Sequence, residues 1–248
     1  MHGGAPSALL AYLLARHDPG SASFIARLTV ELLRPVPLEP LQAVARTIRP
    51  GKNVQWLEAA LLVDGAEVAS ATALRLRPQA VDVDDAVSPT IAALPPPTAG
   101  APPGLERFDR ENIGFWVANE IRIVRGGFGG VAGPATAWFR LRCPVVGSEP
   151  PAAFERVAAA ADFGSGVGNP LPFTRASAIN PEVSIHVYRH PSTDWVGLDS
   201  AGWADRGGVG LAESRLFDET GVLGRAAQTL FVSPLTTDGL RPGFQREP

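Results

Sequence analysis

The sequence is poor in cysteine, in aromatic side chains and in net charge. Cys143 is the only cysteine among the 248 residues, so no intrachain disulfide can form and a disulfide-built secreted domain does not fit. The net charge is only −3, whereas a nucleic-acid binder usually carries a strong basic excess. Aromatic residues make up 7%, while Gly (26) and Pro (24) are frequent. This balance favours a protein of many strands and turns over a helical bundle.

Long hydrophobic runs are also missing. No stretch reaches the roughly 18 apolar residues of a transmembrane helix. Residues 1–6 lack the basic and apolar regions of a signal peptide. With the single cysteine, these absences predict a cytoplasmic protein that has no membrane span and no nucleic-acid partner. The 45% hydrophobic content is nevertheless enough for one large or two moderate domains with real cores.

The first 77 residues predict one helix followed by four strands. Residues 6–16 are apolar on nearly every face, which is typical of a buried helix. Asp64-Gly65 is a strong hairpin signal between the third and fourth strands. We therefore expect a unit at residues 1–77 in which the strands form an antiparallel meander after the helix. The alternating strand patterns occupy residues 24–33, 41–48, 53–63 and 67–76.

The rest of the chain predicts a linker, a second unit and a tail. Residues 78–112 are rich in aspartate and proline, which favours an extended linker. Residues 113–235 are expected to form the second unit, and residues 236–248 a tail. The second unit has two strands ahead of its helix at 150–161, whereas the first unit has none. Its strands are predicted at residues 115–124, 136–142, 182–188, 195–203, 210–218 and 222–232.

The two units repeat one order of elements, which predicts an internal duplication. Each has a helix and then a strand that ends in a basic residue and a proline, at Arg34-Pro35 and at Arg189-His190-Pro191. Each closes with a hairpin that joins an acidic residue to a glycine, Gly65 or Gly221. Counting from these glycines places Thr72 opposite Gln228. A hydrophobic helix that covers one face of an antiparallel sheet is the hotdog arrangement. The predicted fold class is therefore α+β, a double hotdog whose two units each wrap a curved antiparallel sheet around a long buried helix.

Several short motifs follow this order of elements: His2-Gly3-Gly4, residues 24–35, 51–55 and 64–73 in the first unit, and residues 161–163, 184–191 and 221–228 in the second. In these motifs and their order, the chain resembles the type II acyl-CoA thioesterases, which carry tandem hotdog domains. The resemblance implies an acyl-CoA substrate, thioester hydrolysis and no cofactor. Members usually have strands ahead of the Gly-Gly helix, which implies that this chain begins late. Two fused units already form the pair that single hotdogs build as dimers, and exposed sheet edges leave room for a homo-oligomer.

Thioester hydrolysis needs a positioned water, an acceptor for its proton, and donors for the developing oxyanion. The resemblance implies that an Asp, a Thr or Ser, and a Gln hold that water. The matching positions here are Asp162, Asn180 and Gln228. Asn180 departs from the pattern, because an amide can orient water but cannot ionise. Ser177 and Glu182 are nearby substitutes if the register differs.

Each candidate residue also has a structural interpretation. Asp162 lies at a helix end, where it could cap a neighbouring segment. Gln228 lies in a strand of small and apolar residues, where a buried amide must find partners. Asn180 precedes a proline, and Asn-Pro is a common turn pair. Gly3 and Gly4 would let a substrate approach the helix start and would supply oxyanion donors there, or they serve tight packing of helix on sheet.

Two functions remain open from the sequence. One is an acyl-CoA thioesterase, and the other is a non-catalytic module that binds acyl thioesters. A hydratase has less support, because no Asp/His pair lies on one loop. No G-x-S-x-G motif occurs, and the four histidines show no metal-ligand spacing beyond His186 and His190 on one strand. We expect no metal, and a single working site centred on the second unit, because the first helix has no counterpart of Asp162.

Overall fold

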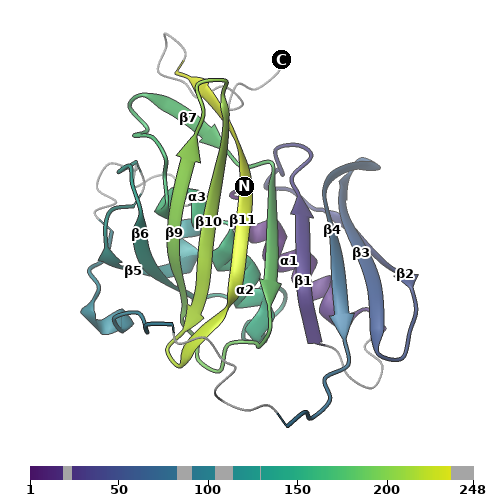
Figure 1. The fold of residues 1–248 in the computed structure, drawn as a ribbon. Helices are drawn as coiled ribbons and strands as arrows, with labels where there is room; N and C mark the ends of the chain where they lie inside the picture. The colour runs from purple at the N-terminus through teal and green to yellow at the C-terminus, as the bar shows by residue number, and fades with distance from the viewer. Residues whose placement is uncertain (19–23, 83–90, 104–113, 129, 236–248) are drawn as a thin grey trace.

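The computed structural model describes residues 1–18, 24–82, 91–103, 114–128 and 130–235. The expected tail lies outside these residues, as do parts of the expected linker. Two main helices lie against one large antiparallel sheet of eleven strands (Figure 1). No helix in the described part of the chain has the length and apolarity to cross a lipid bilayer.

Helix α1 (Gly4–Arg16) and helix α2 (Ala153–Ala161) form where the sequence predicts them. α1 ends at Arg16 with His17 as its C-cap, and Asp18 after it has a φ of 42°. The α1 side chains that face the sheet, among them Leu10 and Leu14, are fully buried. A short helix, α3 (Gly164–Val167), follows α2 and was not expected from the sequence. Two 3-10 turns are η2 (Pro97–Ala99) and η4 (Phe115–Ala118).

The strands follow the predicted positions closely. The expected strand at 115–124 begins only at Asn119, because the four residues before it form η4. Strand β7 was not expected. The strands are β1 (Phe24–Glu31), β2 (Gln42–Arg49), β3 (Val54–Val63), β4 (Ala66–Leu76), β5 (Asn119–Arg125), β6 (Ala135–Leu141), β7 (Ala176–Ile179), β8 (Glu182–Val187), β9 (Val196–Ala204), β10 (Val209–Asp218) and β11 (Gly221–Pro234).

The predicted meander is wrong in one respect, which recurs in both units. The strand order is β2-β3-β4-β1-β8-β11-β10-β9-β6-β5, with β7 paired to β11. The strand with which the predicted meander opens, β1 in the first unit and β8 in the second, therefore lies beside the last strand of its unit and not beside the next. In the first unit, Pro35, Pro37 and Pro40 lie between β1 and β2, and they cannot donate the hydrogen bonds of a tight hairpin. The chain crosses over instead.

The register of the strands repeats between the two units. Thr29 of β1 pairs with Ser184 of β8 at the centre of the sheet. Thr29 also pairs with Thr72, and Ser184 pairs with Ala227, so Thr72 and Ala227 are structural equivalents. The register irregularity that leaves Val68 unpaired recurs at Leu223 with the same sequence offset. Matching register and matching irregularity support a true duplication.

This register corrects the equivalence that was counted from the glycines. Gln228 corresponds to Ala73, and Thr72 is one residue out of step. Each hairpin has a two-residue turn, Asp64-Gly65 in one and Glu219-Thr220 in the other, so Gly65 matches Thr220 and not Gly221. Because side chains alternate between the faces of a strand, the shift matters: Thr72 is exposed, whereas Ala73 and Gln228 are buried.

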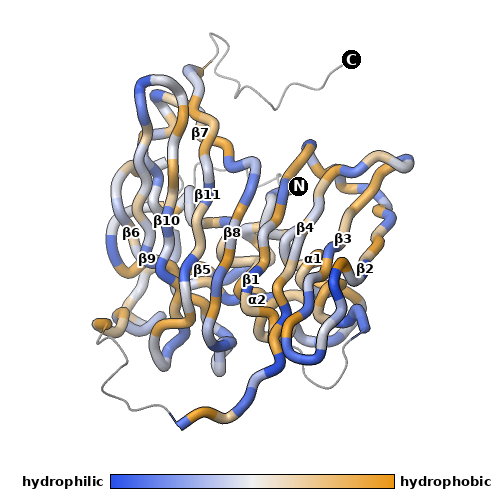
Figure 2. The backbone as a smooth tube through the Cα atoms, turned by 45° about the vertical axis from the view of Figure 1, so that its right-hand side comes forward, coloured by the Kyte–Doolittle hydropathy of each residue, from blue (hydrophilic) through white to orange (hydrophobic). Residues whose placement is uncertain are grey.

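The main core lies between the sheet and the two helices. α1 packs on β1–β4, and α2 packs on β6, β8 and β9. The helices also pack on each other and run antiparallel, because Arg16 at the end of α1 binds Glu155 at the start of α2, with 2.6 Å between Nη1 and Oε1. Hydrophobic and hydrophilic residues alternate along many strands, as expected for a sheet with one covered face (Figure 2).

The described part of the expected linker packs against the second unit. Trp138 of β6 donates its indole N–H to the carbonyl of Pro95 at 2.8 Å. Ala101 forms a β-bridge with Ile123 of β5. Residues 95–101 thus pack against β5 and β6. These two strands have no counterparts in the described part of the first unit.

Candidate active site

The predicted site residues meet where the start of α1 reaches the end of α2. Gly3 is the N-cap of α1, and Asp162 is the C-cap of α2. Because the helices are antiparallel, residues far apart in the sequence come together here. The other end of the helix pair holds the ion pair between Arg16 and Glu155. The two ends are therefore chemically different.

Asp162 is the centre of the cluster. Its side chain is 3% exposed. Oδ1 accepts a hydrogen bond from Nδ2 of Asn180 at 2.7 Å. Oδ2 lies 3.0 Å from Nδ1 of His2. A carboxylate oxygen can accept more than one hydrogen bond, so both oxygens still have the capacity to bind a water molecule.

Gln228 contacts the main chain of Asp162 and not its carboxylate. It is 1% exposed. Nε2 donates to the main-chain carbonyl of Asp162 at 3.2 Å, and Oε1 accepts the N–H of Ser165 at 2.7 Å. The amide therefore fixes the turn between α2 and α3 through two buried hydrogen bonds. These contacts match the structural interpretation of Gln228, and any contact with substrate stays a prediction.

Asn180 is the residue of its segment that reaches the carboxylate. It is half-buried and lies between β7 and β8. Ser177 is buried in β7, paired with Ser233 of β11, and its Oγ has no hydrogen-bond partner within the described residues. Glu182 accepts the N–H of Thr229 at 2.6 Å. Neither suggested substitute for Asn180 has a contact with Asp162 among the interactions of the described chain.

The two glycines lie where larger residues would not fit. A Cβ atom on Gly3 would be 2.7 and 2.8 Å from the carboxylate oxygens of Asp162. A Cβ atom on Gly4 would be 2.5 Å from Phe115 and 2.7 Å from the carbonyl of Ala159. The two glycines thus let α1 approach α2 and Asp162 closely. This packing agrees with the structural interpretation, and a role in substrate binding remains a prediction.

The sequence analysis missed His2 as a partner of Asp162. Its ring stacks on Phe115 with centroids 5.6 Å apart, lies tilted against Phe163 at 4.4 Å, and meets the edge of Trp116 at 5.8 Å. In the sequence, His2 stands out only in the His2-Gly3-Gly4 motif, and nothing there predicts its pairing with an aspartate of the other half. The available signal was the position of His2 directly before the Gly3-Gly4 pair.

The proton on His2 decides its contacts. Nδ1 is 3.1 Å from the N–H of Gly4 as well as 3.0 Å from Asp162. With a proton on Nδ1, the ring donates to the carboxylate. Without that proton, Nδ1 accepts from Gly4, because one ring nitrogen cannot do both. The site therefore holds a buried carboxylate beside a group that can exchange a proton with it, which is suited to general acid–base chemistry.

Two family models together cover most of the chain. The model described as the acyl-CoA thioesterase N-terminal domain matches residues 1–76. The model described as the acyl-CoA thioesterase C-terminal domain matches residues 91–232, which is more than half of the chain. A search of curated proteins finds no match.

Solved structures support the predicted fold. A putative thioesterase from Novosphingobium aromaticivorans is 18% identical with a TM-score of 0.71, over 94% of this chain and 88% of that one. A hot dog fold protein of unknown function from Alicyclobacillus acidocaldarius is 17% identical with a TM-score of 0.72, over 93% and 86%. The acyl-CoA thioesterase II TesB2 from Mycobacterium marinum is 17% identical with a TM-score of 0.64, over 86% and 81%.

At these sequence identities the structural similarity is evidence for the fold alone, and it confirms the predicted double-hotdog fold. The family models reach further, because they match both halves in the expected order. The chain belongs to the acyl-CoA thioesterase family.

Proposed function

We propose that this protein hydrolyses an acyl-CoA to a free acid and CoA, with Asp162 as the general base. The observation that carries the proposal is the buried Asp162 carboxylate, bound by Asn180 and His2 beside the start of α1. A carboxylate in this position can take a proton from a water molecule at 2.6–3.2 Å, the usual range for general-base catalysis.

The reaction proceeds in two steps. The water oxygen attacks the thioester carbonyl carbon while Asp162 takes the water's proton. The tetrahedral intermediate then breaks its C–S bond, and the CoA sulfur leaves with the proton that Asp162 held. The main-chain N–H groups at the start of α1, at Gly3 and Gly4, stabilise the oxyanion, because the N-terminus of a helix carries partial positive charge.

The remaining residues position these groups. Asn180 holds one oxygen of Asp162 and leaves the other to His2 and water. His2 shares the proton with Asp162, which offsets the lack of an ionisable or hydroxyl group at position 180. Gln228 fixes the main chain of Asp162. All three act mainly through Asp162.

The test uses a panel of acyl-CoAs of different chain lengths, with the loss of thioester ultraviolet absorbance as the measurement. Asp162→Asn keeps the shape of the side chain but removes the base. We expect kcat to fall by about 10²–10⁴-fold, the usual contribution of a general base. Asp205→Asn is the matched control, because Asp205 is an exposed aspartate in the turn between β9 and β10. Equal rates for wild type and Asp162→Asn would overturn the role of Asp162.

The second candidate is a module that binds acyl thioesters without hydrolysing them. The observation that favours it is Asn180 in place of a Thr or Ser. In the same experiment, acyl-CoA binding by calorimetry with no turnover above the buffer rate for any chain length would support the module and reject the enzyme.

A further inference from the structure

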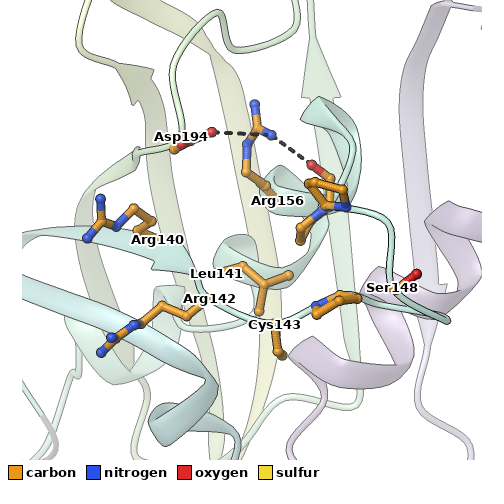
Figure 3. Close-up of a pocket in the computed structure, with 10 residues that line it drawn as sticks. Arg140, Leu141, Arg142, Cys143, Ser148, Arg156 and Asp194 are labelled. Carbon is orange, nitrogen blue, oxygen red and sulfur yellow. Dashed lines mark hydrogen bonds and ion pairs between the residues drawn. The ribbon is translucent and has the colours of Figure 1, made fainter.

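A cavity of about 410 Å³ lies at the end of β6 and the start of α2, away from Asp162. Figure 3 places Arg140 and Arg142 on one side of it, with Arg156 across from them and Leu141 and Cys143 between. The wall also includes the prolines that precede α2. The lining residues are Arg140, Leu141, Arg142, Cys143, Pro144, Ser148, Pro150, Pro151, Arg156 and Asp194.

The cavity is a basic region on a protein whose net charge is −3. Arg140 shares Glu120 with Arg122. Arg156 is held by the carbonyls of Pro151 at 2.8 Å and Thr193 at 3.1 Å, with Asp194 at 3.6 Å. Four guanidinium groups thus meet only two carboxylates, Glu120 and Asp194, which leaves an excess of positive charge.

Arg142 is the guanidinium in this group that is free to bind a ligand. It is exposed, and no interaction of its side chain is recorded with any described residue. The opposite wall is rigid, because Arg156 is fixed by main-chain acceptors. In Figure 3 the Arg142 side chain extends away from Arg156, so Arg142 places an exposed guanidinium at the rim of the cavity and Arg156 a fixed one on its opposite side. Guanidinium groups bind phosphate oxygens through paired hydrogen bonds, so both suit a phosphate ligand.

The cavity and the active site lie at opposite ends of α2. Asp162 comes nine positions after Ala153, which at 1.5 Å per residue is about 14 Å along the helix. Turn η4 connects the two places on the surface. Arg142 donates its main-chain N–H to the carbonyl of Ala118 in η4, and Phe115 in η4 stacks on His2.

We infer that this cavity binds the phosphate groups of the CoA nucleotide while the thioester lies at Asp162. This inference rests on the proposed function. In CoA, the extended pantetheine arm separates the sulfur from a strongly anionic nucleotide. The distance along α2 and the excess of positive charge match that arrangement. The cavity thereby selects for a CoA thioester over a thioester that lacks the nucleotide.

Cys143 provides a direct test of occupancy that does not depend on catalysis. It is exposed, lines the cavity and is the only cysteine in the sequence. Its alkylation by iodoacetamide is measured by mass spectrometry with and without adenosine 3′,5′-bisphosphate. We expect the nucleotide to slow alkylation in the wild type, and to lose this effect in Arg142→Glu. No protection in the wild type, or equal protection by unphosphorylated adenosine, would overturn the inference.

Kinetics give the second test. Arg142→Ala should raise KM for an acyl-CoA by about two- to fivefold, the range expected for an exposed ion pair. It should leave kcat unchanged, and should leave KM for the matching acyl-pantetheine unchanged. Arg206→Ala is the control, because Arg206 is exposed in the turn at the far end of β9. Equal increases for both substrates would contradict the inference, since the effect would then not involve the nucleotide.

The two proposals can fail separately. If Asp162→Asn retains full activity while adenosine 3′,5′-bisphosphate still protects Cys143, the catalytic assignment fails and the nucleotide site stands. If Asp162→Asn is inactive and Cys143 is never protected, the catalytic assignment stands and the nucleotide site fails. Protection by an acidic acyl carrier protein, with none by the nucleotide, would also reject the nucleotide as ligand.

Discussion

Nδ1 of His2 lies 3.0 Å from Oδ2 of Asp162, although these residues belong to different halves of the chain. His2 comes just before the helix of the first half, and Asp162 ends the helix of the second half. The candidate site is thus shared by the two units. Neither half holds the carboxylate, its histidine and the helix start by itself.

The first prediction concerns the proton shared by this pair. His2→Phe keeps a ring that can stack on Phe163 but removes Nδ1. We expect kcat to fall by about tenfold to a hundredfold, a part of the usual general-base effect, with KM changed little.

Two further variants test whether His2 acts through Asp162. His2→Asn places a donor near the position of Nδ1 and should recover part of the rate. His17→Phe should behave as wild type, because the hydrogen bond that His17 accepts uses its main-chain carbonyl. A His2→Phe enzyme with the wild-type kcat would show that His2 only packs.

The second prediction concerns the space that Gly3 leaves for Asp162. In Gly3→Ala, the new methyl group would lie within 2.8 Å of both carboxylate oxygens, so the helix or the carboxylate must move. We expect a loss of about 1–3 kcal/mol in the free energy of unfolding, as for other overpacked sites, and a marked loss of kcat. Urea denaturation and initial rates measure the two effects.

Gly166→Ala is the matched control for this variant. Its added methyl group would meet only Phe128, at 3.8 Å, which is ordinary contact. Stability and activity should stay close to the wild type. If Gly3→Ala were equally harmless, the close approach of α1 to Asp162 would not be needed.

The third prediction separates the structural role of Gln228 from chemistry at the carboxylate. In Gln228→Glu, an ionised side chain still accepts from Ser165 but cannot donate to the carbonyl of Asp162, and two acceptors then face each other. We expect a loss of about 1–3 kcal/mol in the free energy of unfolding. Gln79→Glu, at an exposed glutamine, should cost almost nothing.

Kinetics should distinguish the effect of Gln228→Glu from that of Asp162→Asn. Because Gln228 contacts the main chain and not the carboxylate, kcat of the folded Gln228→Glu protein should fall less than kcat of Asp162→Asn. Activity corrected for the folded fraction, taken from circular dichroism, tests this order. A larger loss in Gln228→Glu would place the amide itself at the reaction centre.

The fourth prediction concerns a buried ion pair outside the site. Burial alone would raise the pKa of the Asp218 carboxyl, but hydrogen bonds from Arg189, Ser192 and Thr220 outweigh it and hold the pKa well below its ordinary value. A lowered pKa in the folded state means that the unfolded state binds the proton first. This contribution to stability is therefore complete above about pH 5 and is lost progressively as the pH falls below that value.

The variant Asp218→Asn measures this contribution. It leaves the guanidinium of Arg189 without its charged partner, which lies 2.7 Å away. We expect a loss of about 3–5 kcal/mol at neutral pH. The difference from wild type should shrink as the pH approaches the acidic range, because protonation removes the same charge in the wild type. Denaturation curves that differ by the same amount at pH 7 and pH 3 would contradict this account.

The sequence predicts the positions of helices and strands much better than it predicts which strands pair with each other. Periodicity and turn residues located both main helices and most strands, because those signals are local. The pairing of β1 with β4 and of β8 with β11 is not a local property, and a meander was the simpler expectation. A one-residue error in the repeat likewise came from counting glycines without knowing which residues form each turn.

For the candidate site as well, the sequence predicts which residues come together but not the contacts that they make. The resemblance placed Asp162, Asn180 and Gln228 in one cluster, and the structure brings them together. That Gln228 reaches the main chain rather than the carboxylate depends on side-chain directions that no sequence pattern specifies. His2 escaped notice because its partner lies in the other half, and only the antiparallel packing of α1 on α2 unites them.

The seam between β1 and β8 also sets the order in which the protein can mature during synthesis. Thr29 finds its partner Ser184 only after most of the chain has been translated. At about 5–20 residues per second, synthesis from Thr29 to Ser184 takes roughly 8–31 s, during which one edge of the first sheet is unpaired. His2 waits slightly longer for Asp162. The β1 edge of the nascent first half is therefore open to wrong pairing until β8 has been made, before any catalytic centre exists.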